Sequence, residues 1–133
     1  MKTLLAIQAK LEVPKSQFNE FGGYNFRSCE DILKAVKPLL EQSNATLIIS
    51  DEIVAVGTPF VCRDSDGNEY VCGQSVFVKA TATLSADGEE PVCVSAFARH
   101  PEARKGMDDS QITGATSSYA RKYALNGLFC IDD

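Results

Sequence analysis

The sequence predicts an α+β fold in which an antiparallel β-meander packs against helices, in the order α-α-β-β-β-α. Two helical patterns open the chain and one long helical pattern closes it. Between them, segments rich in β-branched residues follow one another with short turns, which favours antiparallel strands. About three core strands and one inserted hairpin are expected, and residues 1–133 have the size of a single domain.

The first helix is expected from Thr3 to Leu11, with Thr3 as its N-cap and Pro14 beyond its end. The next stretch, residues 15–28, is polar with interleaved aromatic residues. Its Gly22-Gly23 pair predicts a turn or a close approach of the backbone.

The second helix is expected to begin after Ser28, an N-cap residue followed by acidic residues that the helix dipole favours. Pro38 lies inside its apolar pattern and predicts a kink or a tightened last turn. Asn44 suits its C-terminal end. Lys34 and Lys37 share the polar face, where they either contact a ligand or form an ordinary solvated surface.

Three core strands are expected at residues 46–57, 75–84 and 91–99. The first is predicted to carry a bulge at Ser50-Asp51. Residues 60–73 predict the inserted hairpin, with its turn at Asp66-Gly67. The second core strand alternates, and one of its faces carries Val76, Val78, Ala80, Ala82 and Leu84.

The last helix follows a linker at residues 101–107. Asp108 and Gln111 have the spacing of a capping box, and the helix is expected to end near Asn126 with Gly127 as the C′ residue. The stripe predicted to cover the sheet consists of Ile112, Ala115, Tyr119 and Tyr123. The residues around the other side are Gly114, Ser117, Ser118 and Arg121.

The chain is acidic, with a formal net charge of −5, but its charges are distributed unevenly. Residues 45–98 hold eight Asp and Glu against two Lys and Arg. The two flanking segments hold eleven of the 13 Lys and Arg residues. A basic groove built from these flanks is therefore compatible with the acidic total, although the charge does not demand one.

The five cysteines form no Cys-x-x-Cys pair, and the single histidine, His100, cannot complete a zinc site near them. Reduced thiols in a cytoplasmic protein are expected, and only Cys62 and Cys72, beside the predicted hairpin, are a pair to test for a disulfide. No apolar run reaches the roughly 18 residues needed to span a bilayer. Polar residues interrupt the N-terminal apolar stretch early, which argues against a signal peptide.

The sequence predicts neither an enzyme nor a metal or cofactor site. No Gly-rich stretch ends in Gly-Lys-Ser/Thr, and Ser118 is followed by Arg121 where a Ser-x-x-Lys nucleophile requires lysine. "DSDGNE" is similar to a calcium loop, but Cys62 and Gly73 occupy the first and last ligand positions. His100 has no acid or nucleophile partner in the sequence.

Two stretches combine cations with aromatic residues: "YNFRS" at residues 24–28 and "SSYARKY" at residues 117–123. Cations that neutralise phosphates beside rings that stack on bases are what a single-strand binder needs. Tyr24 and Phe26 also fit buried anchors, and the tyrosines of the second stretch fit the core better still. Small residues beside the Arg121-Lys122 pair allow close approach of a ligand backbone or of a partner helix.

The closing stretch "TGATSSYARKYALNGLFCIDD" resembles the C-terminal signature of the ERF (essential recombination function) family of phage single-strand annealing proteins. "PKSQFNEFGGYNFRSCEDILKAVKPLL" resembles the N-terminal block of that family, and "SDEIVAVG" and "VKATATL" resemble its strands. The resemblance covers about residues 4–133. The segment from Thr58 to Gln74 is longer than the usual connection in the family.

The resemblance implies a protein that binds single-stranded DNA without sequence specificity and anneals complementary strands without ATP. It also implies a homo-oligomer, as a ring or filament, in the cytoplasm of a bacterial host. Recombination and single-strand-binding proteins of the phage or host are implied as partners. The expected DNA contacts are Lys15, Tyr24, Phe26, Arg27, Lys34, Lys37, Ser117, Ser118, Arg121 and Lys122. The alternative is a protein-interaction or oligomerisation module that does not bind DNA.

Overall fold

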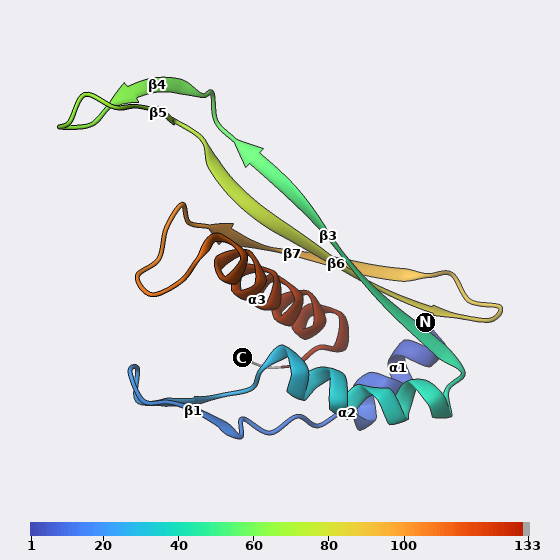
Figure 1. Ribbon diagram of the computed structural model, residues 1–133. Helices are drawn as coiled ribbons and strands as arrows, with labels where there is room; N and C mark the ends of the chain where they lie inside the picture. The colour runs from blue at the N-terminus through green and yellow to red at the C-terminus, as the bar shows by residue number, and fades with distance from the viewer. Residues whose placement is uncertain (132–133) are drawn as a thin grey trace.

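The computed structural model describes residues 1–131 and confirms the predicted α+β class (Figure 1). Its central antiparallel sheet has the strand order β3-β6-β7. These strands span Ala45–Val56, Ser75–Ala86 and Val92–His100, respectively. Helices α1 (Lys2–Lys10), α2 (Cys29–Gln42) and α3 (Asp109–Phe129) lie on one face of the sheet (Figure 1). α3 packs on β6 and β7, while α2 contacts α3 and β3.

Reciprocal hydrogen bonds cap α2 and α3 at the predicted residues. The Ser28 Oγ accepts from the backbone N of Asp31 (3.1 Å), and Asp31 Oδ2 accepts from the backbone N of Ser28 (2.9 Å). The bond from the Ser28 backbone holds the pKa of the Asp31 carboxyl below its ordinary value. Asp108 and Gln111 form the same reciprocal pair at the start of α3.

Two predicted helix ends are wrong. The N-cap of α1 is Met1 and not Thr3, whose backbone N donates to the carboxylate of Glu89 in the β6–β7 turn. Hydrogen bonds from the N-terminal amine and from Thr3 lower the pKa of Glu89 to about 2. α3 continues past Asn126 to Phe129, because Cys130 adopts the left-handed cap conformation (φ 57°) that was expected at Gly127.

The two long strands β3 and β6 pair without interruption, so the predicted bulge at Ser50-Asp51 is wrong. Ser50 lies opposite Thr81, and Asp51 lies opposite Ala80. The alternation predicted for β6 is confirmed: Val78, Ala80, Ala82 and Leu84 are buried on one face, and Val76 at its end is half-buried. Regular pairing keeps Asp51 on the same side of the sheet as Ala80, which is the side that the helices cover.

The inserted hairpin is confirmed as a separate two-stranded sheet, β4 (Phe60–Arg63) and β5 (Glu69–Cys72). Together with the adjoining ends of β3 and β6 it projects beyond α3 (Figure 1), and we call residues 53–78 the arm. A disulfide joins Cys62 and Cys72, so the expectation of reduced thiols is wrong for this pair.

A second small hairpin, β1 (Gln17–Asn19) and β2 (Tyr24–Phe26), was not among the predicted elements. The Asn19 side chain makes its turn, because Oδ1 accepts from the backbone N of Phe21 (2.9 Å) and of Gly22 (3.1 Å). Gly23 completes the turn with a positive φ of 67°. Strands of three residues are too short to show alternation in the sequence.

Ile112 is buried as predicted, but beyond it the buried stripe of α3 lies one residue further along the chain than predicted. The buried residues are Ile112, Thr116, Ala120, Ala124, Leu125, Asn126, Leu128 and Phe129. Tyr119 and Tyr123 remain 53% and 38% exposed, so their assignment to the core is wrong. The small Ala120 and Ala124 of α3 are fully buried, and so are Ala80 and Ala82 of β6, one of the two strands on which α3 packs. Small side chains at buried positions allow the helix to lie close to the sheet, which explains why the helix is so rich in them.

Among residues 1–131, no helix combines the length and apolarity required to cross a membrane.

Candidate nucleic-acid interface

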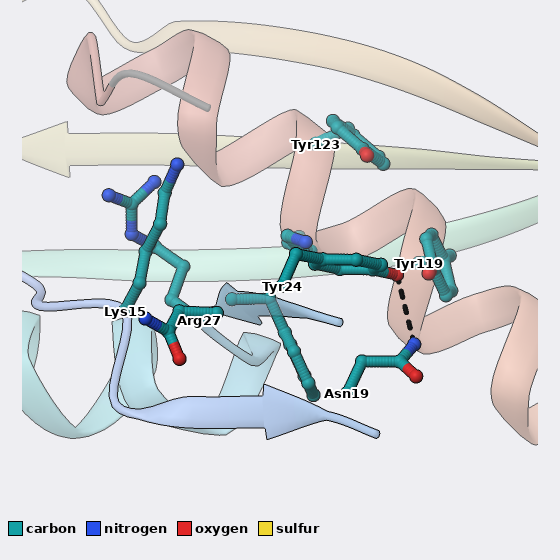
Figure 2. Close-up of a pocket in the computed structure, with 9 residues that line it drawn as sticks. Lys15, Asn19, Tyr24, Arg27, Tyr119 and Tyr123 are labelled. Atoms are coloured by element: carbon teal, nitrogen blue, oxygen red, sulfur yellow. Dashed lines mark hydrogen bonds between the residues drawn. The ribbon is translucent and has the colours of Figure 1, made fainter. Parts of the chain in front are cut away.

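A cavity of about 300 Å³ lies between the β1–β2 hairpin and the outer face of α3 (Figure 2). It brings together the two cation-and-aromatic stretches that the sequence singled out. The lining residues are Lys15, Asn19, Tyr24, Asn25, Phe26, Arg27, Tyr119, Lys122 and Tyr123. Among residues 1–131, this lining includes three cations and four aromatic rings, and no carboxylate, histidine or cysteine.

The β1–β2 hairpin holds one wall of the cavity in place. Asn19 Nδ2 donates to the hydroxyl of Tyr24 (3.0 Å), so the residue that makes the turn also orients this ring (Figure 2). Gly22 lies against the same ring, since a Cβ there would be 2.2 Å from Tyr24 Cε1. The predicted close backbone approach at Gly22 is thereby confirmed. Phe26 meets Tyr24 edge-to-face, with 6.2 Å between ring centroids.

Lys122 of α3 places its ammonium group among the aromatic rings. Its Nζ lies 5.2 Å from the ring centroid of Tyr123, 5.6 Å from that of Tyr119 and 6.0 Å from that of Phe26. Cation–π attraction at these distances favours a lysine near the rings. A ligand phosphate at this position would meet a positive charge, and its base would meet the face of a ring.

Arg27 and Lys15 stand at the other end of the cavity (Figure 2). Arg27 is only 5% exposed, and its Nε donates to the carbonyl oxygen of Val13 (2.9 Å). This bond ties β2 to the segment that follows α1, and it fixes the direction of the guanidinium. Burial of an arginine is costly, so a structural task accompanies any contact that Arg27 makes with a ligand.

Five of the ten sequence-predicted DNA contacts therefore meet in one place: Lys15, Tyr24, Phe26, Arg27 and Lys122. Lys34 and Lys37 lie on the exposed face of α2, outside the cavity lining. Ser118 is exposed on α3 but does not line the cavity either.

Ser117 and Arg121 face the sheet instead of the cavity. Asp51 on β3 accepts from Ser117 Oγ (2.5 Å), from Arg121 Nε (3.1 Å) and from Arg121 Nη2 (3.3 Å). This cluster fastens α3 to β3 across 70 residues of chain. Arg121 and Lys122 are neighbours in the sequence, yet one points to the sheet and the other to the cavity.

Sequence reasoning missed four lining residues, namely Asn19, Asn25, Tyr119 and Tyr123. A signal for the two tyrosines was present, because they lie four residues apart with Lys122 between them. Residues four apart share a helix face, and a lysine beside them marks that face as accessible to solvent. The two asparagines carried no comparable signal.

Replacing Gly114 by alanine is expected to raise the free energy of unfolding by about 0.5–1 kcal/mol. Gly114 lies in the exposed first part of α3, and a Cβ there would meet no atom within 4 Å. Chemical denaturation of the two proteins measures the difference. We also expect unchanged oligonucleotide affinity, because Gly114 does not line the cavity. A weaker affinity would instead support the sequence-based interpretation that a ligand backbone approaches here.

Comparison with known proteins extends the resemblance from separate motifs to the whole chain. The family described as the ERF superfamily matches residues 1–133. The chain is 53% identical over 130 residues to the "Essential recombination function protein" of Salmonella phage P22. That alignment covers 98% of this chain and 54% of the phage protein, so the chain spans about half the length of this relative. No solved structure matches the chain.

Proposed function

This chain belongs to the ERF superfamily, and on that premise we propose that it is a recombination protein that binds single-stranded DNA and anneals complementary strands. The observation that carries the proposal is the composition of the cavity: three cations and four aromatic rings meet there in a chain of net charge −5, and no carboxylate of residues 1–131 lines it. An acidic protein that gathers three cations around exposed rings is suited to an anionic ligand with flat faces.

In the proposed binding mode, the protein contacts the DNA backbone and the faces of the bases. Lys15, Arg27 and Lys122 neutralise phosphates, while Tyr24 and the two tyrosines of α3 stack on bases. Neither contact carries sequence information, which accounts for binding without sequence preference. Neutralised phosphates repel a second strand less, and stacked bases keep their pairing edges accessible. Base pairing then proceeds downhill, so the proposed reaction needs no nucleotide hydrolysis.

The test of this function is the annealing of two complementary oligonucleotides by the chain, without ATP, across a salt series. We expect faster annealing than without protein, and binding that weakens as salt rises. Lys122→Ala is expected to reduce the salt slope of binding by about 0.7, so its loss of affinity relative to the unaltered chain is about fivefold greater at 0.1 M than at 1 M salt.

Arg121→Ala is the matched control, because it removes one positive charge from the adjacent residue. Its guanidinium is paired with Asp51, so this variant is expected to keep the salt slope and to unfold more easily, by about 1 kcal/mol. An equal change of slope in both variants would mean that general charge, and not the cavity, attracts DNA. Absence of annealing and of DNA binding by the unaltered chain would overturn the function.

A second observation favours self-association of the same protein. The arm exposes six large apolar side chains: Ile53, Val56, Phe60, Val61, Tyr70 and Val71. Exposed apolar surface of this extent is typical of interaction sites. We propose that the arm contacts a second copy of the chain, in line with the ring or filament expected for the family. Gel filtration of the chain without DNA tests this self-association, since a monomer would overturn it. The same experiment with an oligonucleotide tests DNA binding, because a module that does not bind DNA would show no DNA-dependent shift.

A further inference from the structure

A second cavity, of about 440 Å³, adjoins the first along α3. Its lining residues are Phe97, Ala98, Arg99, Pro101, Arg104, Ala115, Thr116, Tyr119 and Tyr123. They come from the end of β7, the segment after it, and α3. Tyr119 and Tyr123 line both cavities, so these two rings form a ridge with a cavity on each side.

The charges of the second cavity repeat those of the first. Arg99 and Arg104 are its charged lining residues, and none of the lining residues is acidic. Within the described part of the chain, the two cavities together thus have five cations and no carboxylate in their lining, although the chain has 18 Asp and Glu against 13 Lys and Arg. A short turn presents Arg104, because Met107 N donates to the Arg104 carbonyl oxygen (3.1 Å) and Gly106 takes a positive φ of 82°.

The ridge itself is built for flat ligands. The ring centroids of Tyr119 and Tyr123 are 6.1 Å apart with an interplanar angle of 33°, and both rings are substantially exposed. Both rings stand one helical turn apart on the same rigid helix, so their spacing is set in advance. Aromatic faces flanked on both sides by cations fit a chain in which bases and phosphates alternate, and fit an acidic peptide less well, since that has no rings to stack.

We propose that the second cavity is a further subsite for the same DNA strand. The strand crosses the ridge with bases on Tyr119 and Tyr123, and Arg99 and Arg104 neutralise phosphates beyond it. The inference rests on the proposed function and adds a length requirement to it. An oligonucleotide that fills only the first cavity gains nothing from the two arginines, whereas a longer one does.

The test is fluorescence anisotropy with oligothymidylates of increasing length, comparing the unaltered chain with Arg99→Ala/Arg104→Ala. For long oligonucleotides the double variant is expected to have a salt slope smaller by about 1.4. Its loss of affinity relative to the unaltered chain is then about 25-fold greater at 0.1 M than at 1 M salt. For the shortest oligonucleotides that bind, the two proteins are expected to have equal affinity. Lys34→Ala/Lys37→Ala removes the same charge outside both cavities and is expected to match the unaltered chain at every length.

The outcomes separate the two proposals. If the unaltered chain binds no oligonucleotide of any length, the proposed function fails and the subsite fails with it. If it binds but the arginine variant shows no loss, a loss independent of length, or the same loss as the lysine control, only the subsite is overturned. If the unaltered chain binds a polyglutamate peptide and the arginine variant does not, while both bind oligonucleotides equally, the subsite is overturned and the arginines are assigned to an acidic protein partner.

Discussion

Replacing Tyr119 and Tyr123 together by alanine is expected to lower the affinity for single-stranded DNA at least about 30-fold. A base stacked on an aromatic ring contributes about 1–3 kcal/mol, and two rings are removed from the ridge that both cavities share. The salt slope is expected to stay the same, because the rings carry no charge. Anisotropy titrations at several salt concentrations measure both quantities.

The conservative variant Tyr119→Phe/Tyr123→Phe provides the control. Phenylalanine keeps the ring faces that stack on bases and that surround Lys122 Nζ, so affinity near that of the unaltered chain is expected. Both tyrosines are partly exposed, so the alanine variant is also expected to stay folded. Full affinity in the alanine variant would show that DNA does not cross the ridge. An equal loss in the phenylalanine variant would assign the effect to the hydroxyl groups.

Replacing Ala124 by leucine is expected to reduce the free energy of unfolding by about 1–3 kcal/mol or more. Ala124 is fully buried on α3, which packs on β6 and β7, and the β6 residues Ala80 and Ala82 are fully buried as well. A leucine at this position needs more volume than the close-packed interior offers, so the helix must move away from the sheet to accommodate it. Thermal unfolding of the variant measures the loss.

Ser118→Leu is the control for Ala124→Leu, since Ser118 is exposed on the same helix. Its stability is expected to change by less than about 0.5 kcal/mol. Equal stability of the two variants would contradict the close packing of α3 on β6. DNA binding by Ala124→Leu is also measured at temperatures where the variant stays folded. Weaker binding there would show that the packing of α3 on the sheet also positions the cavity residues on the outer face of the helix.

Several elements could be predicted because their causes are local. The capping boxes at Ser28 and Asp108 need only residues three apart, and the hairpin turn at Asp66-Gly67 needs a glycine with a positive φ. The inward face of β6 follows from alternation along one strand. The family assignment was confirmed for a similar reason, since the long motif of the last helix is specific without any knowledge of its contacts.

The candidate site was predicted only in part, because half of it depends on which way a side chain turns. Lys15, Tyr24, Phe26, Arg27 and Lys122 meet as neighbouring parts of one cavity. Arg121 was expected beside them, but Asp51 of β3 takes its guanidinium. No local sequence pattern around Arg121 predicts that its partner is a carboxylate 70 residues away.

The sequence by itself determined the class of fold, the order of the three helices, the core strands and the inserted hairpin, the family, and the two stretches that carry cations and rings. Only the tertiary structure decided which stripe of the last helix meets the sheet. The stripe of Tyr119 and Tyr123 and the stripe of Ala120 and Ala124 differ by one residue, or about 100° of rotation. Both are regular, and a larger apolar side chain alone would favour the tyrosines. In the structure the alanine stripe is the buried one, because small buried side chains on α3 and on β6 let the helix lie close to the sheet, and the tyrosines stay outside, beside Lys122.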